Sequence, residues 1–437
     1  MILGTVAYGG DSDCGGDFVV MITEKENLLM YSTADRKLKH DTKTLETFEL
    51  PTTKFVNVSA GKTHAVALDD NGSVWTWLMY ESTRSVNANT TIDTETVLGR
   101  EGNRTIPRSL GNEAFKVNNI QHASTAAVMV ACGRRHTMVL MKDGTVWTFG
   151  FGGFGQLGHD SCLPELKPKR IDPCMFHNKN IVMVAAGEFH SMAVSTSGDI
   201  YTWGSSRDGQ LGHGRIQLVV ATPLMIERRF FDSSGVVLVA GGKMHSVVVT
   251  ARGSIFMWGH GNFRGLGLEH PVPGERWCLC ESRRTLIPTQ MQYESLRNSP
   301  RPIMVTCGAD HTVILTDDKN LWIISTLENI PEKIQRGFSA DAEIVTIAAG
   351  DDVSTVVTND GALYTFNFDM YAPYIPIVDQ KPVLTREILV NKRFCIHQKM
   401  QLTRNLSIIH QIPEDVIELI LEDCSNIRLK NTTKIVN

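Results

Sequence analysis

The sequence predicts an all-β protein, a seven-bladed β-propeller followed by a short helical C-terminal tail. Three observations predict this fold class: a glycine–histidine step recurs along the chain, glycine turns separate paired apolar runs, and the second run of each pair is rich in aromatic residues. Repeats of this kind indicate stacked units that bury a shared core. Of the 437 residues, we assign 1–380 to the propeller and 381–437 to the tail.

The repeat begins with Gly-x-x-His, and an aromatic or apolar residue follows the histidine 13 positions later. Five copies contain the histidine: Gly61/His64 with Trp77, Gly133/His136 with Phe149, Gly187/His190 with Trp203, Gly242/His245 with Trp258, and Gly308/His311 with Ile324. Two weaker copies keep the spacing without it, at Gly15, Phe18 and Tyr31 and at Gly350, Val353 and Phe366. The seven copies predict seven blades, joined by loops of variable length.

Each copy also predicts a β-hairpin. Asn71-Gly72 and Asp143-Gly144 lie between two apolar runs, and such tight turns need the positive φ that glycine adopts at low cost. The first run of a pair, such as residues 246–249, is continuously apolar, which predicts a strand covered on both faces. The second, such as residues 200–203, alternates and predicts a half-covered strand. Small sheets packed face to face around an axis accommodate both.

The apolar segment 2–8 precedes the first repeat and predicts a further strand. Propellers often close their ring by pairing the two chain ends within one blade. We therefore expect residues 2–8 to complete the last blade.

The repeat motifs resemble those of the regulator of chromosome condensation family. Gly-x-x-His-(Thr/Ser), Gly-x-(Val/Ile)-(Trp/Tyr)-x-(Trp/Phe)-Gly and Gly-Gln-Leu-Gly follow one another nearly completely at 133–158 and 187–212, and less completely at 242–267. The resemblance covers about residues 1–378 and implies a seven-bladed propeller. The Gly-His…Trp-Asp signature of the WD-repeat family is absent from the sequence.

The composition argues against a nucleic-acid partner, a membrane span and secretion. A net charge of −4 and a pI near 6.4 make nucleic acid an unexpected partner. No apolar run approaches the roughly 18 residues of a membrane span, and Met1-Ile2-Leu3-Gly4 does not resemble a secretory leader. Nine scattered cysteines indicate a reducing compartment, and the lone pair Cys278/Cys280 lacks the second pair of a zinc site. We expect an intracellular monomer, cytoplasmic or nuclear.

Two apparent catalytic signals have structural interpretations. Gly150-x-Gly152-x-x-Gly155 has the spelling of a dinucleotide fingerprint, but Gln156-Leu157-Gly158 and Pro164 follow it instead of a helix. The five repeat histidines are spread around the ring, so we expect each to be buried and hydrogen-bonded to backbone near a turn. The sequence predicts a protein that is not an enzyme and has no cofactor or metal.

Two long connectors interrupt the repeats. The polar insertion at about 80–121 predicts a solvated loop, with a partner-binding arm as the alternative. The connector at about 269–302 contains Trp277, Arg283 and Arg284, residue types that are frequent at binding hot spots. The alternative is that Trp277 packs against the edge of the propeller.

The tail changes character, because glycines vanish and helical spacing begins. Ile412-Pro413-Glu414-Asp415 predicts a helix start, and the stretch through Leu421 resembles the opening helix of an F-box, which recruits a cullin ubiquitin ligase adaptor. That resemblance implies the contact residues Pro413, Val416, Ile417, Ile420 and Leu421. Only 16 residues follow Leu421, too few for a complete F-box, so a helix packed on the propeller is the alternative.

Three functions remain open at this point. A non-catalytic protein-interaction platform is favoured by the propeller. The family resemblance implies guanine-nucleotide exchange on a Ran-type small GTPase, although the first 16 residues contain no Lys or Arg that could form the family's basic tail. The F-box-like helix implies a substrate receptor of a ubiquitin ligase.

Overall fold

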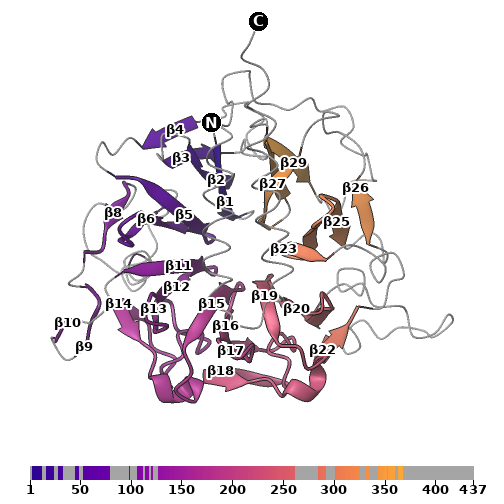
Figure 1. The fold of residues 1–437 in the computed structure, drawn as a ribbon. Helices are drawn as coiled ribbons and strands as arrows, with labels where there is room; N and C mark the ends of the chain where they lie inside the picture. The colour runs from indigo at the N-terminus through magenta and orange to yellow at the C-terminus, as the bar shows by residue number, and fades with distance from the viewer. Residues whose placement is uncertain are drawn as a thin grey trace, which may run out of the picture.

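The computed structural model is a β-propeller in which small sheets radiate from a central axis (Figure 1). It describes residues 2–11, 16–23, 28–32, 45–48, 53–78, 98, 106–111, 114–117, 120–121, 126–260, 284–291, 301–324, 331–334, 343–351, 353–359 and 363–367. Within these residues there are six four-stranded blades and one three-stranded blade. The predicted seven-bladed propeller is confirmed. The predicted tail helix lies outside the described residues.

In each blade the strands run in sequence order from the axis to the rim, each antiparallel to the next. The first blade contains β1 (Ile2–Asp11), β2 (Gly16–Thr23), β3 (Leu28–Ser32) and β4 (Leu45–Phe48). The second contains β5 (Phe55–Ala60), β6 (His64–Asp69), β7 (Val74–Leu78) and β8 (Arg108–Ser109). The third contains β11 (Ala127–Cys132), β12 (His136–Met141), β13 (Val146–Gly150) and β14 (Glu165–Arg170). The fourth contains β15 (Ile181–Ala186), β16 (His190–Ser195), β17 (Ile200–Ser206) and β18 (Gln217–Met225).

The remaining blades follow the same order. The fifth contains β19 (Val236–Gly241), β20 (His245–Thr250), β21 (Ile255–His260) and β22 (Arg284–Gln290), and the sixth contains β23 (Pro302–Cys307), β24 (Thr312–Thr316), β25 (Leu321–Ile324) and β26 (Glu332–Ile334). The seventh contains β27 (Ile344–Ala349), β28 (Val353–Thr358) and β29 (Leu363–Asn367). A small hairpin, β9 (Lys116–Val117) with β10 (Ile120–Gln121), and two 3-10 helices, η3 (Pro173–Phe176) and η4 (Arg228–Phe230), lie between blades.

Strand register confirms the sequence repeat, including its weak copies. Ala65 pairs with Trp77 and Ser191 with Trp203. At the same position of the two copies without histidine, Val19 pairs with Tyr31 and Ser354 with Phe366. The hairpin turns are also as predicted, because Gly72, Gly144, Gly198 and Gly253 all adopt positive φ.

The expected ring closure is wrong. Residues 2–11 form β1, the innermost strand of the first blade, and pair along their length with β2. The three-stranded seventh blade contains no residue of this segment. Only four residues separate this segment from β2 in the sequence, so β1 pairs with the strand that directly follows it. β1 lies beside β27 at the junction of the first and last blades (Figure 1), so packing joins these two blades there.

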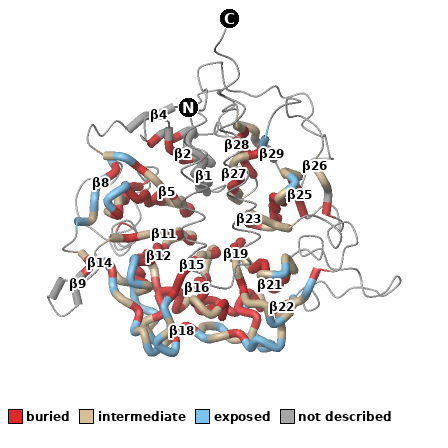
Figure 2. Tube along the Cα trace, in the orientation of Figure 1, coloured by how far each residue is buried: buried red, intermediate tan, exposed pale blue. Residues whose placement is uncertain are grey.

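The core lies between neighbouring blades. Trp77, Trp147, Trp203 and Trp258 are almost fully buried, and the cluster around Trp258 combines residues of the fourth and fifth blades. The third strand of a blade is not half-covered as predicted, since all of β17 is buried. Blades cover both of its faces and β18 covers its edge, so exposure moves to the outer strands (Figure 2).

The two long connectors contribute more to the blades than the sequence indicated. The insertion at 80–121 supplies β8, and its Leu98 and Phe115 are buried. Phe115 contacts Trp147 of the third blade edge to face, with ring centroids 5.5 Å apart. The connector at 269–302 supplies β22, the outer strand of the fifth blade.

Candidate functional site

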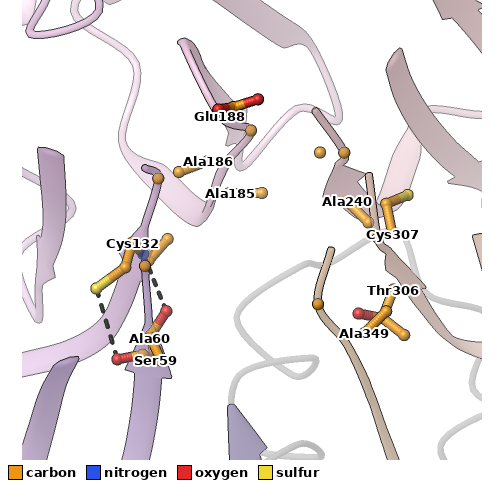
Figure 3. Close-up of a pocket in the computed structure, with 18 of the residues that line it drawn as sticks. Ser59, Ala60, Cys132, Ala185, Ala186, Glu188, Ala240, Thr306, Cys307 and Ala349 are labelled. Atoms are coloured by element: carbon orange, nitrogen blue, oxygen red, sulfur yellow. Dashed lines mark hydrogen bonds between the residues drawn. The ribbon is translucent and has the colours of Figure 1, made fainter. Parts of the chain in front are cut away.

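A central channel marks the axis of the propeller. Inner strands of the second to seventh blades line a volume of about 300 Å³, and small side chains such as Ala60, Ala186 and Ala240 face one another across it (Figure 3). At one mouth of the channel the inner strand of each blade turns into the second strand. The loops between third and fourth strands lie on that same side, because strand direction alternates within a blade. We call this side the loop face.

Glycine and histidine residues of the second to sixth blades follow one another around this mouth, and we call them the glycine–histidine ring. It contains Gly61, Gly133, Gly187, Gly242 and Gly308 with His64, His136, His190, His245 and His311. Each imidazole lies against the glycine of its own repeat. A Cβ on Gly187 would be 2.0 Å from Cε1 of His190 and 2.6 Å from the carbonyl oxygen of Gly242 in the next blade. The Gly-x-x-His spacing therefore reflects close packing within and between blades.

Each histidine of the ring bonds to the neighbouring blade. Nε2 lies within hydrogen-bond distance of a hydroxyl there: His64 to Thr137 (2.8 Å), His136 to Ser191 (3.0 Å), His190 to Ser246 (2.8 Å), His245 to Thr312 (3.2 Å) and His311 to Ser354 (2.6 Å). Burial is as predicted. A backbone group also bonds His245, through Ala309, but the partner common to all five imidazoles is a hydroxyl that the sequence did not predict. In every pair the hydroxyl belongs to the first or second residue of a second strand, and sequence spacing alone does not show that this position faces the preceding blade.

The hydroxyls fix the tautomer of two of these imidazoles. Ser191 and Ser246 donate to the carbonyl oxygens of Gln156 and Gln210, both at 2.8 Å, so each hydroxyl accepts its second bond from an Nε2–H. Burial lowers the pKa of His64, His136, His190 and His311 to about 3, and that of His245 to about 4. The five imidazoles are therefore neutral near pH 7, and His136 and His190 join blades as uncharged donors.

The glycine-rich loops complete these contacts. The carbonyl of Gln156 in the third blade also accepts from Nε1 of Trp203 in the fourth, and Gln210 accepts from Trp258 in the fifth. The Gln156 side chain folds back to accept from the amide of Phe154 at 2.9 Å. The Gly150-x-Gly152-x-x-Gly155 loop, whose pattern resembles a dinucleotide-binding fingerprint, thus connects and joins blades, as the sequence predicted.

Aromatic and cationic side chains gather on the loop face over the third and fourth blades. Phe151, Phe154 and Phe189 are each half-buried, and ring centroids are 6.0 Å apart for Phe151/Phe154 and 4.9 Å for Phe154/Phe189. Guanidinium groups lie over the rings: Arg135 over Phe151 (5.4 Å), Arg134 over Phe189 (5.6 Å) and Arg207 over Phe154 (5.5 Å). We call these six residues the phenylalanine–arginine cluster.

Ion pairs surround the cluster and the channel mouth. Glu188 pairs with Arg134. Asp351 of the seventh blade pairs with Lys62 of the second at 3.7 Å, so this ion pair passes the first blade at the channel mouth. Burial raises the pKa of Asp310, which occupies the corresponding turn of the sixth blade. Among the described residues of the loop face, arginines gather over the third and fourth blades, whereas Asp310 and Asp351 lie over the sixth and seventh.

The structure places one of the residues predicted from the sequence to bind a partner. Arg284 is the first residue of β22, is exposed, and pairs with Asp208 of the fourth blade at 3.3 Å. Trp277, Arg283 and the tail residues Pro413, Val416, Ile417, Ile420 and Leu421 lie outside the described residues.

Sequence reasoning missed the phenylalanine–arginine cluster. The signal that could have found it is the difference between adjacent repeats: Phe151 and Phe154 align with Ser205 and Asp208. Among the described residues, no group of three or more His, Cys, Asp or Glu side chains could hold a metal ion. No helix in that part of the chain is both long and apolar enough to cross a membrane.

Comparisons with known proteins identify the repeat. A family model described as an RCC1-like domain matches residues 10–324. The chain is 31% identical over 220 residues to the ultraviolet-B receptor UVR8 of Arabidopsis thaliana, which covers 49% of this chain and 43% of the receptor. It is 26% identical over 350 residues to the mitochondrial RCC1 domain-containing protein RUG3 of the same plant, and this match covers 75% of this chain and 69% of RUG3.

The match to the ubiquitin-protein ligase HERC2 of Mus musculus is 29% identical over 258 residues and covers 56% of this chain but 5% of the ligase. The chain thus spans less than half the length of UVR8 and a small part of HERC2.

Solved structures agree on the fold. Prp20p from Saccharomyces cerevisiae has a TM-score of 0.63 at 16% identity, covering 91% of this chain and 85% of its own. Human WBSCR16 has a TM-score of 0.60 at 19% identity, covering 82% and 88%. The family model matches well over half of the chain and the motif resemblance is confirmed, so this chain belongs to the RCC1-like domain family.

Proposed function

We propose that this chain is a non-catalytic protein-interaction propeller that binds its partner on the loop face, over the third and fourth blades. One observation carries the proposal: three half-buried phenylalanines and three arginines form a continuous cluster at positions that the repeat does not need. Aromatic residues and arginine are the types most enriched at binding hot spots.

The adjacent repeat supports this interpretation. In the fourth blade, Ser205 and Asp208 replace Phe151 and Phe154, yet the loop keeps its hydrogen bonds. The amide of Asp208 donates to the Gln210 side chain at 2.9 Å, the same contact that Phe154 makes with Gln156. The third-blade loop therefore does not need Phe151 and Phe154 for its own hydrogen bonds. A role in binding a partner explains why these two partly exposed phenylalanines are present.

The ring histidines support a role without catalysis. Each is buried between blades and bonded to a hydroxyl, and its lowered pKa keeps it neutral. A general acid or base needs contact with a substrate and a pKa nearer to the working pH. We infer that these residues hold the scaffold together while the loop face binds.

Affinity capture with the full-length chain, read by quantitative mass spectrometry, tests the proposal. The Phe151→Ser/Phe154→Asp variant, which carries the fourth-blade residues in the third-blade loop, should lose a discrete set of captured proteins. Leu166→Ala, which changes an exposed side chain on β14, is the matched control and should retain that set. Equal capture by the two variants would overturn the proposed binding face.

A nucleotide-exchange assay tests the alternative function, guanine-nucleotide exchange on a small GTPase. Release of labelled nucleotide from a Ran-type GTPase is measured with and without the protein, and we expect no acceleration. Acceleration at substoichiometric protein would replace the proposed platform with an exchange factor.

A further inference from the structure

We infer that the phenylalanine–arginine cluster recognises a short acidic segment of a partner protein that also carries an apolar anchor residue. This inference rests on the proposed function and names the chemistry of the partner. Three properties of the cluster carry it: the charge of its rim, the aromatic surface at its centre and the fixed backbone beneath it.

The charge of the cluster favours carboxylates. It contains three arginines, and Arg134 shows that they bind this group, because it pairs with Glu188. Arg207 is exposed with its guanidinium 5.5 Å from the Phe154 ring centroid. A guanidinium that stacks on a ring can still direct its N–H groups outward in the plane, the geometry that binds carboxylates with two parallel hydrogen bonds.

The centre of the cluster provides an apolar surface. Phe154 contacts both Phe151 and Phe189 edge to face, so the three rings form one continuous patch. Leu163 adjoins the Phe151 loop, because a Cβ on Gly152 would lie 2.1 Å from the Leu163 carbonyl oxygen, and its side chain is 71% exposed. A leucine or phenylalanine of a partner can bury its side chain against this apolar surface, and the removal of apolar area from water favours binding.

The backbone beneath the cluster is held in place before any partner binds. The Phe151 amide donates to the carbonyl of Arg135 at 2.8 Å, and the Phe154 amide donates to the Gln156 side chain. Little loop ordering then opposes binding, which leaves more of the contact energy as affinity.

The charges of the described turns at the channel mouth favour a short peptide over a nucleic acid. Asp351 and Asp310 lie at the corresponding turns of the seventh and sixth blades, and the chain carries a net charge of −4. A polyphosphate that extended across the channel mouth would meet these carboxylates. A short acidic segment can contact the arginines alone.

Fluorescence anisotropy with the full-length chain tests the inference. The probe is a labelled peptide in which glutamate alternates with leucine and phenylalanine, compared with a glutamine version, a version with serine at the apolar positions, and single-stranded RNA. The acidic apolar peptide should bind most tightly, and added salt should weaken it. Arg135→Gln/Arg207→Gln and Phe154→Ala should each weaken it about tenfold or more. The exposed Lys167→Gln and Leu166→Ala on β14 are the matched controls and should leave affinity unchanged.

The outcomes separate this inference from the proposed function. Absence of acidic-peptide binding, equal binding by the cluster variants, or tighter binding of RNA would overturn it. If affinity capture still depends on Phe151 and Phe154 while the acidic peptide fails to bind, the binding face stands and the acidic partner is wrong. If neither assay depends on the cluster, both proposals fall.

Discussion

The loops of the third and fourth blades have the same architecture and different surfaces. In both, a threonine of the third strand donates to a loop carbonyl at 2.7 Å, Thr148 to Leu157 and Thr202 to Leu211. In both, the glutamine side chain accepts from the loop backbone, and its carbonyl accepts from a tryptophan of the following blade.

The two loops differ at residues whose side chains take no part in these shared hydrogen bonds. Phe151 and Phe154 in one loop stand where Ser205 and Asp208 stand in the other. Because one chain contains both versions, the comparison separates positions that build the propeller from positions that are open to function. It teaches that the repeat motif predicts the scaffold, and that departures within the repeat mark the candidate site.

Acidification should have the largest effect on the shared architecture. The five ring histidines have folded-state pKa values of about 3 or 4, below the ordinary 6.5, so the unfolded chain takes up protons first as pH falls. Their stabilising effect is complete above about pH 6.5 and is lost between there and pH 3–4. From near pH 7 to about pH 5.5, protonation of each histidine in the unfolded chain should lower the free energy of unfolding by about 1.2 kcal/mol, or by about 6 kcal/mol for the five together.

Urea unfolding at the two pH values measures this loss. His159 and His213 are shifted in the same direction and add to it. A His190→Ala chain should lose about 1 kcal/mol less over the same interval. A free energy of unfolding that is equal at both pH values would show that the histidines are not buried as neutral groups.

A methyl group within the glycine–histidine ring should have the next largest effect. Gly187→Ala places a Cβ 2.0 Å from His190 and 2.6 Å from the Gly242 carbonyl, and the next blade must move to admit it. We expect a loss of about 3 kcal/mol in unfolding free energy. Gly111→Ala is the control, since no atom lies within 4 Å of its Cβ and only its positive φ opposes alanine, at about 1–2 kcal/mol. Equal losses would contradict the packing role of the ring.

Removal of one imidazole should have a moderate effect that depends on its partner. His190→Ala leaves the Ser246 hydroxyl without its donor across the fourth and fifth blades, and should cost about 1–3 kcal/mol. Ser246→Ala in the His190→Ala background should cost less than it does in the wild type, and a double-mutant cycle measures the coupling. Strictly additive losses would show that the two residues act independently.

The sequence predicted most of the scaffold because the scaffold is local. A 13-residue interval and a glycine turn specify a hairpin, and the register of β28 with β29 shows that they do so even where histidine is absent. Spacing does not say which face of a strand meets another blade. For that reason the hydroxyl partners of the histidines were not predicted, and the closure by β1 and the exposure of β17 were predicted incorrectly.

The candidate site was harder to predict than the scaffold. Attention to tryptophan and arginine led to Trp277 and Arg283, which lie outside the described residues, and to Arg284, which forms an ion pair with Asp208. Phe151 and Phe154 are distant from Phe189 and Arg207 in sequence, and the packing of the third blade against the fourth brings the two pairs together.

Exchange of loop residues should have the smallest effect on stability. Phe151→Ser/Phe154→Asp keeps every hydrogen bond that the fourth-blade loop makes with the same residues. We expect the free energy of unfolding to change by about 0.5 kcal/mol or less, as for most surface substitutions. Thermal melting measures it, and a loss comparable with that of Gly187→Ala would mean that the two phenylalanines belong to the core.

The central claim is that positions conserved between the repeats of this chain hold the propeller together, whereas positions that differ between the third-blade and fourth-blade loops bind a partner. One paired measurement tests it most directly: unfolding free energy and acidic-peptide affinity, determined on the same samples of His190→Ala and Phe151→Ser/Phe154→Asp. We predict that His190→Ala lowers stability and keeps the affinity of the folded protein, whereas the loop exchange keeps stability and loses at least about tenfold in affinity. The reverse pattern, with binding lost through His190 and stability lost through the loop, would contradict the account.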